Sequence, residues 1–283
     1  MSARAAGTGR TTGTAGAAGT GRAAGTALVT AIAVVAVAAG CGRGAGTSAT
    51  ELTVFVAASL KPVLLPIATG YASVAPGVTL RFASDSSAAL ATQIEYGAPA
   101  DVFLSADTGN PARLVAAGIA TGQAVPFARN LLAIVVPEGN PGRIVGPADL
   151  AREGVRVIAA NDAVPISSYA AELIDRLAGL PNSPAGFADG YARNVVSRED
   201  SVASVVAKIE LGEGDAGIVY ATDAAASDAL GTIAIPPEAN VAATYAGVVV
   251  GGPRARPASA FLGWLTGPGG QAILAAHGFL PGP

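Results

Sequence analysis

The stretch FASDSSAALATQI, from Phe82 to Ile94, joins the end of a predicted strand to the start of a predicted helix. Apolar residues alternate with other residues up to Phe82, and from Ala88 they recur at three- and four-residue spacing. Four polar residues lie between the two patterns, from Ser84 to Ser87. Serine and aspartate are preferred where a helix begins, because their side chains accept a hydrogen bond from its unpaired N–H groups. The stretch therefore predicts the strand-to-helix unit of an α/β protein.

The same alternation of short strands and amphipathic helices continues from residue 51 to the end of the chain. Strands are expected over Leu52–Ala57, Val78–Ala83, Val102–Ser105, Leu131–Val136, Val155–Ala159, Ala216–Tyr220, Thr232–Ile235 and Tyr245–Val250. Helices are expected over Leu60–Ala75, Ala88–Tyr96, Ala112–Ala117, Tyr169–Leu177, Val202–Leu211, Pro257–Leu265 and Gly270–Ala276. This order is typical of an α/β fold with mainly parallel sheets.

The order of elements predicts two lobes rather than one sheet. Residues 51–129 form a compact first half, and the apolar run NLLAIVVP from Asn130 to Pro137 opens a second lobe, residues 130–241. Residues 242–283 then return to the first lobe through the strand Tyr245–Val250 and add the two closing helices. Two crossings of the chain imply a cleft between the lobes.

The first 40 residues differ in composition from the rest and are expected to be an export leader. Their only charges are three arginines, and Thr26–Ala39 is an apolar run too short to span a bilayer comfortably. The run ends in Ala-Ala-Gly-Cys at Cys41, which resembles the lipobox of bacterial lipoprotein signal peptides. A lipid anchor at Cys41 and a flexible tether over residues 41–50 are expected. An ordinary cleaved signal peptide and an uncleaved anchor helix are the alternatives.

Composition excludes several classes of protein. Cys41 is the only cysteine, so neither an internal disulfide nor a cysteine metal cluster can form. Without the three arginines of the leader, fourteen basic residues face twenty acidic ones, a net charge of −6. A negative net charge without a basic run argues against a nucleic-acid partner.

Hydroxyl and carboxyl side chains recur at four predicted strand-to-helix junctions: Ser59; Ser86 and Ser87; Ser167 and Ser168; and Asp200 and Ser201. In a parallel sheet such junctions share the carboxyl edge, where ligands bind. A helix N-terminus attracts an anion through its free N–H groups and partial positive charge, without a cationic side chain. Any one junction is an ordinary cap, but four in a chain with 17 basic residues and one histidine indicate an anion site.

Five motifs carry a resemblance to a known family: VFVAASL (54–60), SSAALATQIEYGAPADVFLSAD (86–107), NLLAIVVP (130–137), GDAGIVYATDA (214–224) and GGQAILAAHGF (269–279). Together they resemble the molybdate-binding proteins of bacterial ABC importers. The resemblance runs from about Glu51 to Pro281. It implies a type II periplasmic-binding-protein fold, in which two α/β lobes are joined by two crossing strands and close on a tetrahedral oxyanion.

The resemblance also implies the ligands of the anion. Ser59 and Ser87 would contribute hydroxyl and backbone N–H groups from the first lobe, and Ile166 and Ser201 backbone N–H groups from the second. The phenol of Tyr220 would complete the set. Molybdate or tungstate would be the ligand, and a membrane permease with its ATPase the partner. The resemblance implies a monomer outside the cytoplasm that is no enzyme and needs no cofactor.

Two positions depart from the family pattern. Asp85 stands where a small residue is common, and Ile166-Ser167 replaces Ala-Gly. The second change is tolerable, because the expected donor is a backbone N–H, and Ser167 could add a hydroxyl. A carboxylate about 5 Å from a dianion would repel it by roughly 1 to 3 kcal/mol. We therefore expect Asp85 to turn away from the site and to cap its helix.

Three other functions are weighed against this one. Sulfate has the same donor requirement as molybdate, whereas phosphate keeps a proton and needs an acceptor, which an inward Asp85 would supply. A serine hydrolase would need a base, and His277, the one histidine, lies in a closing helix away from the expected cleft. A cation site is not expected, because Asp101, Asp107, Asp215 and Asp223 lie in separate turns.

Overall fold

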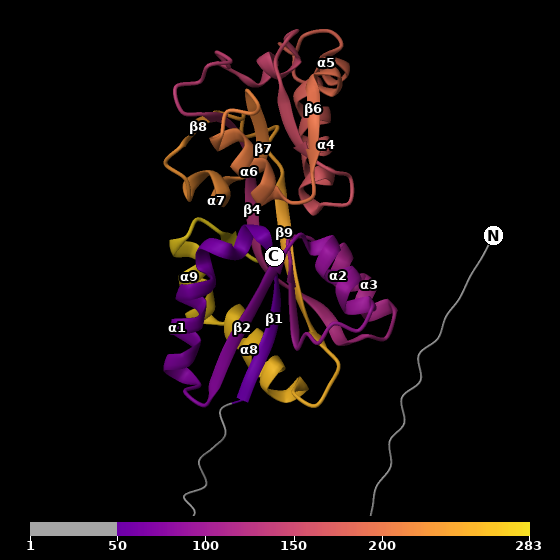
Figure 1. Ribbon diagram of the computed structural model, residues 1–283, viewed down its shortest axis with the longest axis vertical. Helices are drawn as coiled ribbons and strands as arrows, with labels where there is room; N and C mark the ends of the chain where they lie inside the picture. Colours follow the sequence, from indigo (N-terminus) through magenta and orange to yellow (C-terminus); the bar gives the residue numbers. More distant parts are fainter. Residues whose placement is uncertain (1–49) are drawn as a thin grey trace, which may run out of the picture. The chain divides into compact units, whose positions relative to one another are not determined.

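The computed structural model describes residues 50–283, drawn in colour in Figure 1. The expected signal peptide, the cysteine Cys41 and the tether up to residue 49 lie outside the described residues. Among the described residues, no helix has both the length and the apolar character needed to cross a membrane.

The first lobe is built on a sheet in which three neighbouring strands are parallel. In spatial order they are β2 (Val78–Asp85), β1 (Thr50–Ala57) and β3 (Val102–Ser105). Val54 of β1 lies opposite Phe82 of β2 on one side and Val102 of β3 on the other. Two antiparallel strands, β9 (Ala242–Val250) and β4 (Ala120–Pro137), and the short β10 (Leu280–Pro281) complete this sheet.

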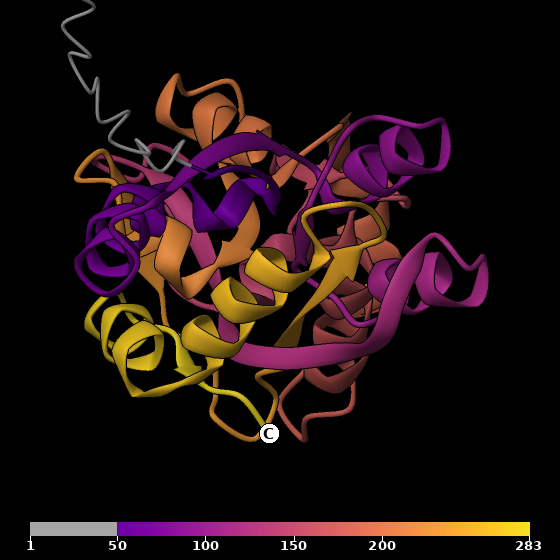
Figure 2. The same ribbon diagram turned by 90° about the horizontal axis from the view of Figure 1, so that it is seen from below.

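Helices cover both faces of the first sheet. Successive side chains of each strand point to opposite faces, and both sets are buried. Phe55, Phe103 and Val248 face one cluster, which contains α2 (Ser87–Glu95) and α3 (Gly109–Ala116). The residues before and after these three along each strand point to the opposite face, which a second group of helices covers. These are η1 (Ala58–Val63), α1 (Leu64–Val74), α8 (Ala255–Thr266) and α9 (Pro268–Ala276). Figure 2 shows the two groups of helices on opposite sides of the strands.

The second lobe repeats the arrangement on a smaller sheet. Its parallel strands are β6 (Val195–Glu199), β5 (Val157–Ala160) and β7 (Ala216–Tyr220), and β8 (Leu230–Ile233) pairs with β4. Its helices are η2 (Pro147–Ala151), α4 (Pro165–Ala178), α5 (Phe187–Asn194), α6 (Val202–Glu210) and α7 (Ala221–Ala225).

Strand β4 belongs to both sheets. Its residues 120–131 pair with β9, whereas residues 132–137 pair with β7 and β8. The change of partner falls between Leu131, opposite Ala242, and Leu132, opposite Tyr220. The chain therefore passes between the lobes along β4 and returns along β9, as Figure 1 shows.

The α/β fold with two lobes and two crossing strands is confirmed. All eight expected strands are present, but β4 begins at Ala120, eleven residues before the expected start at Leu131, and β6, β10, η2, α5 and α7 were not expected. β6 alternates between half-buried and exposed residues and carries Ser, Arg and Glu, which hides it in the sequence. Helix α4 begins at Pro165, not near Tyr169, because proline fits the first helical position, where its missing N–H costs nothing.

Candidate ligand-binding site

A small cavity lies where the carboxyl ends of the parallel strands of the two lobes meet. The first lobe lines it with Ala57, Ala58, Ser59, Ser86, Ser87 and Ala106, and the second with Val164, Pro165, Val202 and Tyr220. Each group directly follows a strand, which is the position expected for a ligand site in parallel sheets. The cavity has a volume of only about 10 Å³, so the walls formed by the two lobes nearly meet. No lysine, arginine, histidine, aspartate or glutamate is among the lining residues.

The Ser87 hydroxyl is placed to donate into this cavity. Ser87 is the first residue of α2, is 1% exposed, and its Oγ accepts a hydrogen bond of 3.0 Å from the N–H of Ala106. The preceding Ser86 is the N-cap, and its Oγ accepts from Ala89 N–H at 3.3 Å. Because Ser87 Oγ is already an acceptor, its proton remains for another partner. The two serines thus divide the roles of cap and donor.

The Ser59 hydroxyl lies on the same wall, supported from behind by a tyrosine. Ser59 belongs to η1, is 1% exposed, and its Oγ is 2.8 Å from Tyr245 Oη on the crossing strand β9. Tyr245 was not expected from the sequence. Its position within a strand carries no capping signal, and 186 residues separate it from Ser59.

Tyr220 brings a third hydroxyl, from the second lobe. It ends β7, is 1% exposed, and its Oη has no hydrogen-bond partner among the described residues. Burial raises the pKa of Tyr220 well above its usual value, so the phenol is neutral and keeps its proton. A buried polar group without a partner costs free energy, and a donor that lines a cavity in this state is suited to a ligand acceptor.

The two backbone donors expected in the second lobe lie beside the cavity. Ile166 is the second residue of α4, so its N–H is among the first groups of the helix, which have no partner within it. Ser201 is the N-cap of α6, and its Oγ accepts from Ser204 N–H at 3.2 Å. The lining residues are their neighbours Pro165 and Val202, while the Ile166 side chain lines a separate cavity behind α4.

Asp85 turns away from the cavity, in agreement with the expectation. It is exposed, and its Oδ1 accepts from Ser86 N–H at 2.7 Å, although Ser86 and not Asp85 caps the helix. The expectation that Ser167 could add a hydroxyl is wrong. Ser167 lies inside α4 and not before it, and its Oγ donates to the carbonyls of Ala160 at the end of β5 and of Asn161 just after it. Ser168 Oγ likewise donates to the carbonyl of Pro165.

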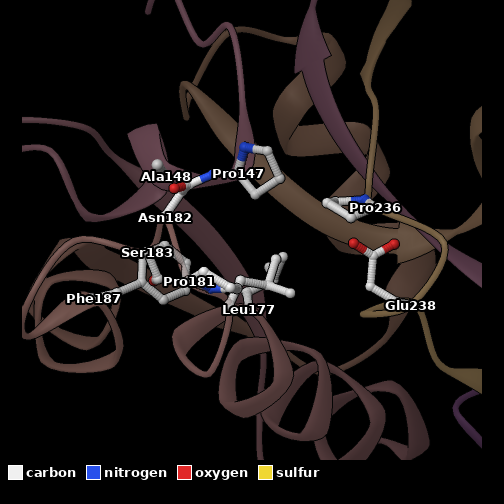
Figure 3. A pocket seen from close by; sticks show the side chains of 10 residues that line it. Pro147, Ala148, Leu177, Pro181, Asn182, Ser183, Phe187, Pro236 and Glu238 are labelled. Atoms are coloured by element: carbon white, nitrogen blue, oxygen red, sulfur yellow. The ribbon is translucent and has the colours of Figure 1, made fainter.

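Larger cavities elsewhere lack this convergence of donors. The cavity in Figure 3, about 270 Å³, lies in the second lobe and is lined largely by apolar groups such as Leu177, Pro181 and Phe187. Glu238 lies at its side, and a carboxylate there would oppose an anion. Another cavity, about 640 Å³, contains Asp85 and Asp200 from opposite lobes. The small cavity is therefore the best candidate for an anion.

The carboxylates and the histidine expected to lie outside the site do so. Asp101 accepts from Thr53 N–H at 2.8 Å and pairs with Arg254 Nε at 2.8 Å, which ties β1 to α8. His277 ends α9, with Nδ1 2.8 Å from the carbonyl oxygen of Ile273. Among residues 50–283, no group of three or more His, Cys, Asp or Glu side chains could hold a metal ion.

Comparison with known proteins decides the family. A family model described as bacterial extracellular solute-binding protein matches residues 52–280. The chain belongs to this family. It is an extracytoplasmic solute-binding protein and not an enzyme. The serine-hydrolase alternative is therefore rejected. Proteins of this family bind their solute without a cofactor.

The relatives and solved structures that resemble this chain differ in the anion named for them. The molybdate-binding protein ModA of Mycobacterium bovis is 36% identical over 234 residues, which cover 82% of this chain and 85% of the relative. The periplasmic molybdate-binding protein of Azotobacter vinelandii has a TM-score of 0.67 at 26% identity, covering 81% and 99% of the two chains. The sulfate-binding protein SubI of Mycobacterium tuberculosis has a TM-score of 0.72 at 24% identity, covering 82% and 87%. This last likeness shows the fold alone.

Proposed function

We propose that this solute-binding protein captures molybdate, and also tungstate, for an ABC importer. The ligand would bind in the small cavity between the lobes, where Ser59, Ser87 and Tyr220 converge. Backbone N–H groups at Ile166 and Ser201 would complete its shell from the helix starts of the second lobe.

The observation that carries the proposal is the hydroxyl of Tyr220, which has no hydrogen-bond partner within residues 50–283. It is buried and neutral, and it lines the cavity together with two serine hydroxyls of the other lobe. A fully deprotonated tetrahedral anion offers acceptors only, so it matches a set of donors. Each hydrogen bond to a charged oxygen contributes about 1.5 to 3 kcal/mol. Several such bonds can hold a dianion without a cationic side chain, provided water is excluded.

Phosphate is the less suitable ligand because it keeps a proton that needs an acceptor. The nearest candidate acceptor in the sequence, Asp85, points to its own backbone and does not line the cavity. Sulfate meets the same donors as molybdate, so hydrogen-bond chemistry does not separate the two. The 36% identity to a molybdate-binding protein favours the larger anion.

We propose that the lobes, residues 51–129 with 242–283 and residues 130–241, close around the anion by bending at the two crossing strands. Support comes from the nearly touching walls of the cavity and from strand β4, which changes partner at Leu132. Hinge closure of this kind removes water from the ligand and so strengthens each hydrogen bond.

We also propose that a lipid on Cys41 anchors the mature protein to the outer face of the cell membrane, where it acts as a monomer and delivers its anion to a permease and ATPase. The support is the sequence alone, because Cys41 lies outside the described residues. Detergent phase partition of cell extracts tests the anchor. The native chain should enter the detergent phase, and the Cys41→Ser variant should stay in the aqueous phase. Equal partition of both would contradict lipidation.

Calorimetric competition among molybdate, tungstate, sulfate and phosphate tests the ligand. Molybdate and tungstate should bind with similar affinity, sulfate more weakly, and phosphate least. Heat with phosphate and none with molybdate would replace the proposal by a phosphate receptor.

A further inference from the structure

Four buried polar side chains form a hydrogen-bonded chain behind the candidate site. Asn130 Nδ2 donates to Thr222 Oγ1 at 2.7 Å and to Tyr245 Oη at 3.4 Å. Tyr245 Oη is in turn 2.8 Å from Ser59 Oγ, which lines the cavity. All four residues are buried, with exposures of 0% for Asn130 and Tyr245, 1% for Ser59 and 5% for Thr222.

This chain of hydrogen bonds follows the connection between the lobes. Asn130 lies on β4, two residues before the strand changes its partner from β9 to β7, and Tyr245 lies on β9 opposite Ala128. Thr222 belongs to α7 of the second lobe and Ser59 to η1 of the first. The two middle members are therefore on the two crossing strands.

Packing holds the Tyr245 ring in one place. Its edge-to-face neighbours are Tyr220 and Phe279, both with ring centroids 5.5 Å away, and Phe127 at 6.1 Å. A ring fixed on three sides fixes the position of its hydroxyl oxygen as well. The oxygen is thus held next to Ser59 independently of any ligand.

The direction of the hydrogen bonds follows from the groups involved. Asn130 Nδ2 can only donate, so Tyr245 Oη accepts from it. Burial raises the pKa of Tyr245 well above its usual value, so the phenol keeps its proton. Asn130 presents its Nδ2 to Tyr245 Oη, and its Oδ1 makes no hydrogen bond among residues 50–283. The acceptor within hydrogen-bond distance of the tyrosine proton is therefore Ser59 Oγ. Ser59 therefore receives a hydrogen bond from behind, and its own proton is directed to the cavity.

We propose that Tyr245, held by Asn130, is a positioning residue that occupies one lone pair of Ser59 Oγ and directs the serine proton into the cavity, so that Ser59 meets the ligand as a donor. The proposal rests on the proposed function, in which Ser59 binds an oxyanion. It adds a source of selectivity: a serine whose proton points to the ligand suits molybdate, which offers acceptors only, and is less suited to the proton of hydrogen phosphate, which needs an acceptor.

The test is a double-mutant cycle measured by calorimetry with molybdate and with phosphate. The variants are Ser59→Ala, Tyr245→Phe, and both together in the full chain. Tyr245→Phe should weaken molybdate binding about three- to tenfold, the value of one hydrogen bond. It should have no further effect in the Ser59→Ala background, because the serine through which it acts is gone. The preference for molybdate over phosphate should also narrow in Tyr245→Phe, a change that a purely structural role would not produce.

Tyr71→Phe is the matched control. Tyr71 is a buried tyrosine of α1 whose ring packs on Phe261 and Trp264, away from the cavity. Removal of the Tyr71 hydroxyl should leave the affinities for molybdate and for phosphate unchanged.

Three results would overturn the proposal while the native protein still binds molybdate. These are additive losses in the double variant, an unchanged preference between the two anions, and binding by Tyr245→Phe that is equal or tighter. The last result would mean that Ser59 donates to Tyr245. If the native protein bound no oxyanion, the proposed function itself would fail, and the two failures are thus distinct.

A second variant covers the case in which Tyr245→Phe does not fold. Asn130→Ala removes the donor to Tyr245 but leaves the tyrosine in place. It should weaken molybdate binding about two- to threefold in the native background and not at all in Ser59→Ala. Equal losses in both backgrounds would count against the proposal.

Discussion

Single hydroxyl groups have different roles in this protein according to what they contact. Ser86 accepts from a helix N–H, Ser167 donates to two carbonyls, and Tyr220 Oη contacts no polar group among residues 50–283. A hydroxyl that is satisfied by its own chain has little to offer a ligand. The partners of each hydroxyl therefore identify the binding groups better than the residue type does.

The loss of the Ser87 hydroxyl tests its role as a donor. Ser87→Ala should weaken molybdate binding by about tenfold, because it removes one hydrogen bond to a charged oxygen. Titration calorimetry measures the change. Ser73→Ala is the control, since Ser73 is exposed on α1 and donates to the carbonyl of Gly70. Unchanged affinity in Ser87→Ala would place the ligand elsewhere.

The Tyr220 hydroxyl should have opposite effects on stability and on binding. Tyr220→Phe removes a buried hydroxyl that has no hydrogen-bond partner in the described part of the chain, so the free protein should become more stable by about 1 to 3 kcal/mol. The same change removes a ligand donor and should weaken molybdate binding about tenfold or more. Urea unfolding of the free protein and calorimetry measure the two effects. A loss of stability without loss of affinity would refute the role given to this group.

At the scale of elements, the strand-to-helix connections bring the first turns of several helices to one place. η1, α2, α4 and α6 all begin beside the cavity, and each follows a strand of its parallel sheet. Their N–H groups supply partial positive charge without a basic side chain. This arrangement explains how a chain of net negative charge can bind an anion.

Helix α7 contains a carboxyl group that should make stability depend on pH. Asp223 is buried, its Oδ2 is 3.3 Å from Tyr220 N, and burial raises its pKa from 3.8 to about 7. Between pH 4 and 7 the folded protein thus binds more protons than the unfolded chain does. The contribution of Asp223 to the unfolding free energy is fully present below about pH 4 and is lost as the pH rises through 7.

The variant Asp223→Asn should remove this dependence. The amide oxygen can still accept from Tyr220 N–H, but it carries no charge at high pH. Relative to the native protein, the variant should gain about 2.7 kcal/mol of unfolding free energy between pH 5 and 8, because the pH units from 5 up to the folded pKa of about 7 contribute about 1.36 kcal/mol each. Urea unfolding at both pH values measures this gain. Asp189→Asn, at an exposed position in the first turn of α5, is the control. If the unfolding free energies of the variant and the native protein differed by the same amount at pH 5 and at pH 8, the prediction would be wrong.

For the whole molecule, a ligand held by both lobes should stabilise the fold by mass action. Molybdate at one hundred times its Kd should add about 2.7 kcal/mol, which raises Tm by roughly 5 to 10 °C for a unit of this size. Thermal unfolding followed by fluorescence measures the shift, with sodium chloride of equal ionic strength as the control. Equal shifts with molybdate and chloride would point to a general salt effect.

Local sequence determined much of the fold. The β-branched runs and the three- and four-residue spacings predicted eight of the ten strands found in residues 50–283 and the order of the main helices, because these patterns depend on neighbours a few residues apart. β6 and α5 were not predicted, since each is short and its polar residues interrupt the apolar spacing. The polar junctions at Ser59 and Ser87 also pointed to the carboxyl edge of the sheets.

Only the tertiary structure decided which hydroxyls face the cavity and what supports them. Ser167 and Ser87 look alike in the sequence, yet α4 begins at Pro165, and the carbonyls of Ala160 and Asn161 at the end of β5 take up the Ser167 hydroxyl. Tyr245 contacts Ser59 across 186 residues, and the Tyr220 ring packs against the Tyr245 ring. Contacts between residues far apart in the chain depend on how the sheets pair, and no local pattern records that.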